Sequence, residues 1–533
     1  MQITTDKIRR FLSENKWVIL ASVFFIVWKF FLIGILWQGR IAPPEPDDSY
    51  IYTGYINSVV QCPTFLCNYP YINFNSYEGF TYLSYRIIFG GIAKIAHLNP
   101  IQMFHISFYM GTILLLPILI FLLTKFTKNK SLIALSIFFL ALFHGSGSYH
   151  GFYWVVPSFF ATALFFLIFS LIFSKNYYRY IYLFILVPIY IFMHPISIYT
   201  IAIFPLFFIF YSICEKNINT AILKNVFFII FVSLLTYIPF SIYESHAIIR
   251  NPLSIEQTLS TTTTTIQKEA TGANQKKISQ PTLSAQIFPG MDGIITSYIK
   301  WLFPHWIGMI LFILFLSLII YHKNVKLLSL YFSTLLFVFL SSLNEFGYRS
   351  LVLLWPITFI FYAFGTYYLF IFIDDKIKNR RLRALMFVLV SIGIFLFATL
   401  NIFYSIAINR NTNARNDIAL NETFTTYLFN HTDKTSEISY SEKLLSSYSL
   451  NTQLLSRGYA NTIPDATYYV QLKNTNPEIY ESQDLSNFFN FFSKLLGASR
   501  TKPTNKTQEQ NIPNFILEKT FNNISIYKNS KYL

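Results

Sequence analysis

Long apolar segments recur along most of the chain, and this feature limits its fold more than any other. About eleven of them approach the roughly 20 residues that a helix needs to cross a bilayer. Hydrophobic residues make up 53% of the 533 residues and charged residues only 12%, which is too little charge for a soluble surface. The sequence therefore predicts an α-helical polytopic membrane protein. The predicted spans are approximately 17–37, 101–123, 131–143, 154–173, 180–193, 196–213, 226–242, 301–321, 327–342, 350–373 and 384–406.

Basic residues mark alternate loops and so predict the topology. Lys7, Arg9, Arg10 and Lys16 precede the first span, which favours a cytoplasmic N-terminus by the positive-inside rule. Because the first span is long and lacks a small-residue cleavage site, it is not a cleaved signal peptide. The formal net charge of +16 is explained by topology, so nucleic acid is not expected as a partner. The alternate basic loops are 125–130, 175–179, 216–224, 323–326 and 376–383.

One further apolar segment, 80–97, is predicted to lie along the membrane surface. If it crossed the bilayer, every later basic loop would change sides. Arg86 and Lys94 lie off its apolar side, as expected of a helix in the headgroup plane. A second helix of this kind is predicted over 49–60. The first extracytoplasmic loop, 38–100, is therefore expected to be a folded element.

Two adjacent carboxylates, Asp47 and Asp48, stand in this loop at the start of the predicted helix 49–60. Acidic residues are favoured at helix N-termini, so one interpretation is that the pair only caps the helix. The other is that a carboxylate acts as a general base at the membrane surface, and that the pair holds a divalent metal ion. The dipeptide alone does not decide between them.

Other polar residues are predicted on the same side of the membrane. His144 and His150 lie in a Gly/Ser-rich loop, and His194 lies between two spans; each histidine is either structural or functional. Arg349 stands at the mouth of a span, where an arginine is costly unless it meets an anion. Its guanidinium suits a phosphate, although Glu345, one turn earlier, is an alternative partner.

The rest of the chain divides into two parts. Segment 243–300 has a Thr-, Gln- and Lys-rich composition that predicts a mobile loop, which is either a lid or an insertion. Residues 407–533 are predicted to form a small soluble α/β domain. Its expected elements are strands at 466–472 and 523–527 and a helix at 485–496.

This arrangement, with Pro46-Asp47-Asp48-Ser49-Tyr50 opening the first outer loop, resembles the GT-C superfamily of integral membrane glycosyltransferases. The superfamily includes protein O-mannosyltransferases, aminoarabinose transferases and oligosaccharyltransferase catalytic subunits. By position, Asp47 matches the first acid of the family pair and Asp48 the second, whereas Glu45-Pro46-Asp47 also fits the Glu-x-Asp form of oligosaccharyltransferases. Which acid is the base is therefore left open.

The resemblance implies an inverting hexosyl- or pentosyltransferase in which residues 1–406 form the catalytic membrane domain. The donor would be a polyprenyl-phosphate-linked sugar, and the acceptor a cell-envelope glycan, lipid or protein. Lys29, within the first span, either meets the donor phosphate or snorkels to the surface. The residues expected to bind phosphate are Arg349, His194 and His150, and the other expected substrate contacts are Tyr50, Glu345 and His144.

The expected location is the inner membrane, with the active site and the C-terminal domain outside. Two rival functions are a transporter or flippase for lipid-linked saccharides and a polysaccharide polymerase. A transporter is expected to place ionisable groups near the bilayer midplane and to show an internal repeat. The spans after the first are nearly free of charge and show no repeat, which favours the glycosyltransferase.

Overall fold

The fold was determined as a computed structural model. It describes residues 5–37, 48–61, 82–142, 156–250, 306–341, 350–396, 399, 431, 437–440, 458–459, 467–472, 515–521 and 524–532.

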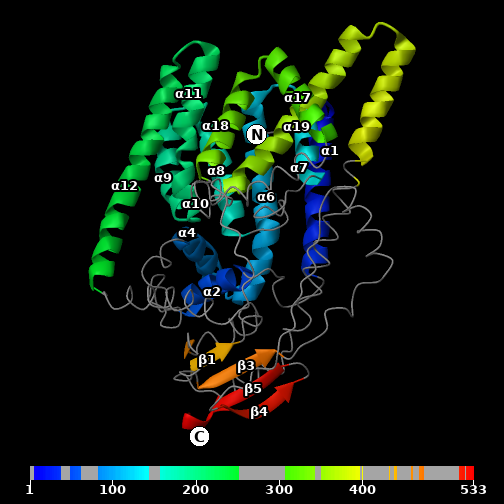
Figure 1. Cartoon of the computed structure of the whole chain (residues 1–533). Helices are drawn as coiled ribbons and strands as arrows, with labels where there is room; N and C mark the ends of the chain where they lie inside the picture. The colour runs from blue at the N-terminus through cyan, green and yellow to red at the C-terminus, as the bar shows by residue number, and fades with distance from the viewer. Residues whose placement is uncertain are drawn as a thin grey trace, which may run out of the picture.

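A bundle of long helices forms the body of the protein (Figure 1). Helical residues occupy part or all of every predicted span. Five of the described helices are long and apolar enough to cross a membrane, and five more are shorter apolar helices. The chain is thus an α-helical polytopic membrane protein. The bundle helices are α1 (Thr5–Trp37), α6 (Pro100–Phe126), α7 (Lys130–Leu142), α8 (Pro157–Ile172), α9 (Arg179–Ile191), α10 (Ile196–Thr200), α11 (Ile203–Glu215), α12 (Thr220–Arg250), α17 (Trp306–Tyr321), α18 (Val325–Ser341) and α19 (Leu351–Lys376), followed by helical residues 380–396.

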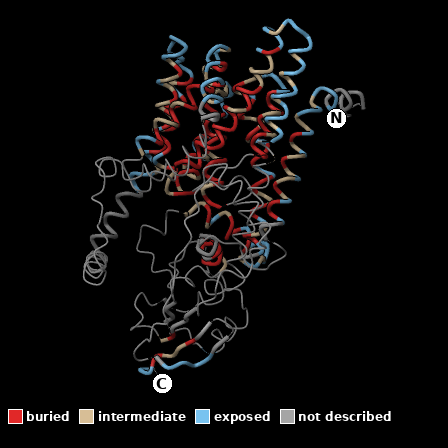
Figure 2. The backbone as a smooth tube through the Cα atoms, turned by 45° about the vertical axis from the view of Figure 1, so that its right-hand side comes forward, coloured by how far each residue is buried: buried red, intermediate tan, exposed pale blue. Residues whose placement is uncertain are grey.

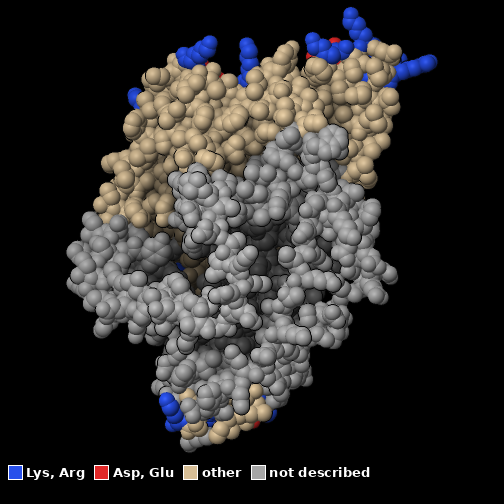
Figure 3. Space-filling model, in the orientation of Figure 1, with Lys and Arg blue, Asp and Glu red and all other residues tan. Residues whose placement is uncertain are grey.

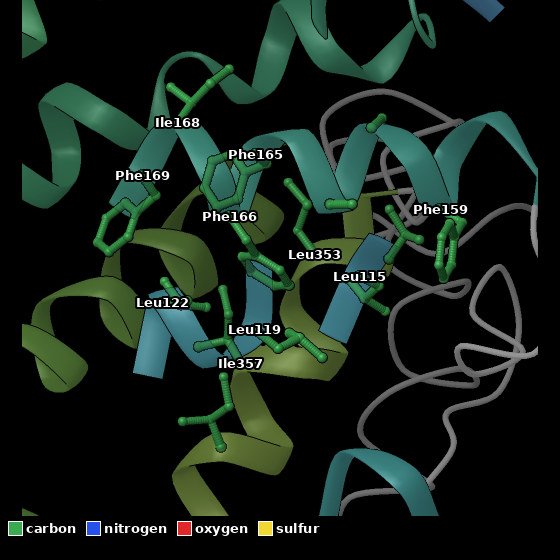
Figure 4. Packing of buried hydrophobic residues seen from close by; sticks show 14 of the residues in the cluster. Leu115, Leu119, Leu122, Phe159, Phe165, Phe166, Ile168, Phe169, Leu353 and Ile357 are labelled. Atoms are coloured by element: carbon green, nitrogen blue, oxygen red, sulfur yellow. The ribbon is translucent and has the colours of Figure 1, made fainter. Parts of the chain in front are cut away.

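Leucine and phenylalanine side chains fill the interior of the bundle. Figure 4 shows Leu119 of α6, Phe166 of α8 and Leu353 of α19 meeting between the three helices. Each of these side chains is buried. Apolar residues on the outer sides are exposed instead (Figure 2), as expected where lipid replaces water.

The loops predicted to share one side of the membrane lie together at one end of the bundle. Lys130 pairs with Glu14 at 3.6 Å, and Lys326 Nζ donates to the carbonyl of Lys125 at 3.1 Å. Arg179 Nε donates to Asn225 Oδ1 at 2.9 Å, which joins two more of the loops. Lys and Arg side chains gather at this end, the top in Figure 3. The predicted grouping of the basic loops is confirmed.

Short helices cover the other end of α6. They are α2 (Asp48–Gln61) and a second helix made of α4 (Leu83–Tyr85), the π-helical turn η1 (Arg86–Gly90) and α5 (Gly91–Ile95). The helices predicted at 49–60 and 80–97 are therefore confirmed, although the second is shorter than expected. The amide of Ser84 donates to the carbonyl of Phe192 at 3.0 Å, which joins α4 to the end of α9.

The close approach of α2 and η1 depends on a glycine. A Cβ atom at Gly90 would lie 2.5 Å from Cβ of Val59 and 3.1 Å from the carbonyl oxygen of Ile56. Both contacts belong to α2, and the oxygen is a backbone atom that cannot rotate away. Only glycine therefore lets the two helices meet at this distance.

The predicted start of the long loop at residue 243 is wrong. Helix α12 continues to Arg250, so residues 243–250 are helical. Asn251-Pro252 follows directly, and the ring of a proline disfavours the α conformation in the residue before it. The bound at Arg250 agrees with that preference, whereas Pro239 is accommodated inside the helix. The rest of 243–300 and the predicted helix 485–496 lie outside the described residues.

A five-stranded mixed sheet contains the described strands of the C-terminal region. Its strand order is β2-β1-β3-β5-β4, with β1 parallel to β2 and β3, and with β5 antiparallel to β3 and β4. The strands predicted at 466–472 and 523–527 are confirmed as β3 and β5. The sheet lies beyond α2, away from the basic loops (Figure 1). The strands are β1 (Glu437–Tyr440), β2 (Gly458–Tyr459), β3 (Tyr468–Leu472), β4 (Phe515–Phe521) and β5 (Ile524–Asn529).

Gly90→Ala is expected to destabilise the protein by about 1–3 kcal/mol, because the added methyl group overpacks the contact with Val59. The measurement is the midpoint of thermal unfolding in detergent micelles. Gly393→Ala is the matched control, since nothing lies within 4 Å of its Cβ position and alanine favours a helix. Equal midpoints for the two variants would show that α2 does not depend on this contact.

Candidate functional site

The predicted site residues fall mostly outside the part of the chain that the structure describes. Asp48 is the first residue of α2 and Tyr50 lies in its first turn, but only their backbone is described. His194 is described in full. Asp47, His144, His150, Glu345 and Arg349 lie outside the described residues. Their predicted roles remain predictions.

His194 is buried in the tight turn between α9 and α10, with 6% of its surface exposed. Its Nδ1 accepts a hydrogen bond from the amide of Ile196 at 3.2 Å, and its carbonyl accepts one from the amide of Ser197 at 2.9 Å. In the neutral imidazole an accepting Nδ1 leaves the proton on Nε2. The turn thus fixes both the position and the tautomer of the ring.

Three tyrosines connect His194 to α2. The ring centres of Tyr82 and His194 are 5.6 Å apart in a T-shaped contact. The ring centres of Tyr55 and Tyr82 are 5.1 Å apart in a stacked contact. The ring centres of Tyr52 and Tyr82 are 5.7 Å apart. Tyr52 follows Asp48 by four residues, a rise of about 6 Å along the helix. This tyrosine cluster, Tyr52, Tyr55 and Tyr82, therefore holds the acidic start of α2 to the same end of the bundle as His194.

Arg86 lies in η1 and adds a cation to this end. Its Nη2 donates to Ser58 Oγ at 3.2 Å, and its guanidinium lies 6.0 Å from the centre of the Tyr55 ring. Burial lowers the pKa of Arg86, and Tyr55 opposes that shift. Because the ordinary arginine value is so high, the group stays charged at neutral pH. The π-helical geometry around it is rare and often occurs at functional sites.

Sequence reasoning did not assign Arg86 to the site. It was interpreted only as the polar side of a surface helix. One pattern could have identified it, because Arg86 lies on the side where the positive-inside rule leaves few basic residues. A cation there is better explained by a local contact than by topology.

Lys29 of α1 is buried, with 1% of its surface exposed, so the snorkelling interpretation is wrong. Its Nζ donates to the carbonyl of Ala141 at 2.8 Å and lies 5.8 Å from the centre of the Phe25 ring. Ala141 is in the last turn of α7, where the final carbonyls lack helical partners and a cation is favourable. Lys29 therefore caps α7 from inside the bundle.

A metal site is not found in the part of the chain that the structure describes. No group of three or more His, Cys, Asp or Glu residues is close enough there to hold an ion. Asp47 is outside that part, so the predicted divalent ion at Asp47 and Asp48 stays a prediction.

No protein-family model matches the chain, and no curated protein matches it. The fold is similar to solved structures of an oligosaccharyltransferase from Archaeoglobus fulgidus, in the apo form and tethered to an acceptor peptide containing the NVT sequon. Both have a TM-score of 0.46 and 11% identity, over 89% of this chain and 68% of theirs.

A third structure is AglB from the same organism, in complex with an inhibitory peptide and a dolichol-phosphate. It has a TM-score of 0.43 and 10% identity, over 85% of this chain and 69% of its own.

Tyr82→Ala is expected to loosen α2, because the variant loses the ring contacts to Tyr55, Tyr52 and His194. Aromatic pairs contribute about 0.5–1.5 kcal/mol each, so protection of the α2 amides should fall at least roughly tenfold. Hydrogen exchange read by mass spectrometry over 48–61 measures this.

Two controls accompany the Tyr82 experiment. Tyr82→Phe keeps the ring and should leave the exchange unchanged. Tyr199→Ala removes an exposed tyrosine of the nearby α10 and should also have no effect on α2. Unaltered protection in Tyr82→Ala would mean that the tyrosine cluster does not hold α2 in place.

Proposed function

We propose that this chain is an inverting glycosyltransferase that moves a sugar from a polyprenyl-phosphate carrier to a glycan, lipid or protein acceptor at the outer membrane surface. One observation supports this most strongly. The acidic start of α2 is held through the tyrosine cluster to the buried His194, at the end of the bundle opposite the basic loops. The backbone of Asp48, an oriented imidazole and the Arg86 cation thus belong to one end of the bundle.

The location suits a donor that is dissolved in lipid and an acceptor outside it. Helix α2 packs across the end of α6, where the apolar bundle stops. A polyprenyl chain could lie along the apolar helices while its phosphate and sugar meet the polar end. Residues 1–406 form the catalytic part in this proposal, and 407–533 form a separate outer domain.

Asp47 is the proposed base. Its carboxylate takes the proton from an acceptor hydroxyl while that oxygen bonds to the anomeric carbon. The bond from the anomeric carbon to the phosphate oxygen breaks through an oxocarbenium-like state, and its electron pair leaves with the polyprenyl phosphate. Attack on the face opposite the phosphate inverts the anomeric centre. Asp48 orients the acceptor or holds a metal ion.

Cations stabilise the negative charge that grows on the leaving phosphate. Arg349 is the proposed principal contact, because its planar guanidinium can meet two phosphate oxygens. His194 and His150 are the proposed additional donors. Tyr50, Glu345 and His144 are the proposed contacts to the sugar and the acceptor, and Arg86 contributes positive potential from η1.

Asp47→Asn is expected to lower the transfer rate by about 10² to 10⁴, because the amide keeps the size of the side chain but cannot accept the proton. The measurement is transfer of radiolabelled sugar from a panel of polyprenyl-phosphate sugars to cell-envelope fractions, using purified protein in proteoliposomes. Asp48→Asn should be milder. Arg349→Ala should chiefly raise KM for the donor, and Arg349→Lys should restore part of it.

Glu45→Gln is the discriminating control in this panel. Loss of transfer in Glu45→Gln with normal transfer in Asp47→Asn would move the base to Glu45. If none of the three acid variants affects transfer by a folded protein, the acids only cap α2 and the proposed site is wrong. Movement of intact lipid-linked saccharide without any transfer would favour the transporter.

The proposed orientation can be tested separately by cysteine labelling in a background where the native cysteines are replaced by serine. Ser49→Cys should react with a membrane-impermeant thiol reagent in intact cells, because α2 is proposed to face outward. Asn379→Cys, in the loop after α19, should react only after the cells are opened. The reverse pattern would place the acidic residues in the cytoplasm and end the proposal.

A further inference from the structure

Two half-buried lysines meet at the end of the bundle that carries the basic loops. Lys125 is in the last turn of α6, and Lys326 is in the first turn of α18. Lys326 Nζ donates to the carbonyl oxygen of Lys125 at 3.1 Å. The Lys326 ammonium is thus bonded to the backbone of the residue that carries the other cation, so the two lysines occupy adjacent positions. The two lysines are 201 positions apart in the chain, so this lysine pair joins helices that are distant in the sequence.

Each ammonium group of the lysine pair lies over an aromatic ring. Lys125 Nζ is 4.0 Å from the centre of the Phe121 ring, and Lys326 Nζ is 5.0 Å from the centre of the Phe173 ring. Phe121 is on α6 itself, and Phe173 directly follows α8. These rings hold the cations at the level where the apolar helices end, instead of letting them extend into water.

The lysine pair lacks a carboxylate partner among the described residues. The ion pairs found there are Lys130 with Glu14 and Arg383 with Asp374. Glu215, at the exposed end of α11, attracts Lys326 but is too far away to form a salt bridge. Among the described residues, positive charge at this place is therefore only partly balanced.

Topology alone does not require such a pair. Lys128 and Lys323 lie in the same two loops, are exposed, and satisfy the positive-inside rule equally well. Two like charges in adjacent positions repel each other, and a bound anion would offset that repulsion. The lysine pair thus has the charge and the setting of an anion site.

The surface below the lysine pair is apolar. Phe121, Ile118 and Leu114 precede Lys125 by 4, 7 and 11 residues, which places them on one face of α6 beneath it. Phe121 and Ile118 are partly exposed, and 55% of Leu114 is exposed. A soluble anion would make no contact with this apolar face, whereas the acyl chains of a lipid would cover it.

We propose that Lys125 and Lys326 bind the phosphodiester of an anionic phospholipid, whose acyl chains lie along the Leu114–Ile118–Phe121 face of α6. Both ammonium groups donate to the phosphate oxygens, and the repulsion between them is relieved. Basic pockets between membrane helices are a recurrent way of binding anionic headgroups. The bound lipid would tie the start of α18 to the end of α6.

The test measures binding of phosphatidylglycerol to the purified full chain by native mass spectrometry, with phosphatidylcholine as the neutral reference. Each lysine near an anionic headgroup contributes about 1 kcal/mol, or about fivefold in affinity. Lys125→Gln and Lys326→Gln should therefore each weaken binding about fivefold, and the double variant about thirtyfold. Glutamine keeps a donor for the interhelical hydrogen bond.

Matched variants separate this site from general charge attraction. Lys128→Gln with Lys323→Gln removes two exposed lysines from the same loops and should leave phosphatidylglycerol binding within about twofold. The charge-keeping Lys125→Arg with Lys326→Arg should also bind. Glu215→Gln, an exposed substitution, should strengthen binding because it removes the acid that competes for Lys326.

Three results would overturn the proposal. They are phosphatidylglycerol binding by the double glutamine variant equal to that of the native chain, an equal loss of affinity in the exposed control pair, and weaker binding by Glu215→Gln. A further arm uses inorganic phosphate. If it displaces phosphatidylglycerol at equal concentration, the site recognises a free anion and the lipid assignment is wrong.

Discussion

The contact of α2 with η1 at Gly90 is the interaction on which the candidate site depends. Helix α2 carries Asp48 at its start, and nearly all of its described side chains are buried against the rest of the protein. Gly90 lets its backbone approach η1, and the tyrosine cluster then fills the space beside it. Tyr82 also contacts His194, so the same packing contacts position the start of α2 and the imidazole.

Hydropathy and charge predicted most of the fold because the bilayer imposes them directly. Span positions, the grouping of the basic loops and the surface helix at 83–95 all depend on segment length or on charge, which are local properties of the sequence. The extension of α12 to Arg250 was missed because the composition turns polar before the helix ends. Polarity alone does not decide where α12 ends, and neither does proline alone, since Pro239 lies inside the helix.

The site was less predictable than the fold because its contacts join distant segments. Tyr55, Tyr82 and His194 come from three separate segments, and no spacing along the chain relates them. Arg86 was missed for a similar reason: its hydrogen bond to Ser58 exists only once α2 is docked. The snorkelling prediction for Lys29 was wrong because it assumes that the side chain is free to reach the membrane surface. Inside the bundle, its ammonium group instead donates to the carbonyl of Ala141 at the end of α7.

Cations at the two ends of the bundle are held in different ways, and the difference bears on function. The lysines of the basic loops are mostly exposed and act through the number of charges on one side. Arg86 is partly buried, bonded to Ser58 and fixed beside Tyr55, so its direction is defined as well as its charge. A topology signal needs no direction, but stabilising charge on a leaving phosphate does, because donors must point to where the oxygens will be. Arg86 is therefore an oriented guanidinium packed against the middle and the C-terminal part of α2, at Tyr55 and Ser58.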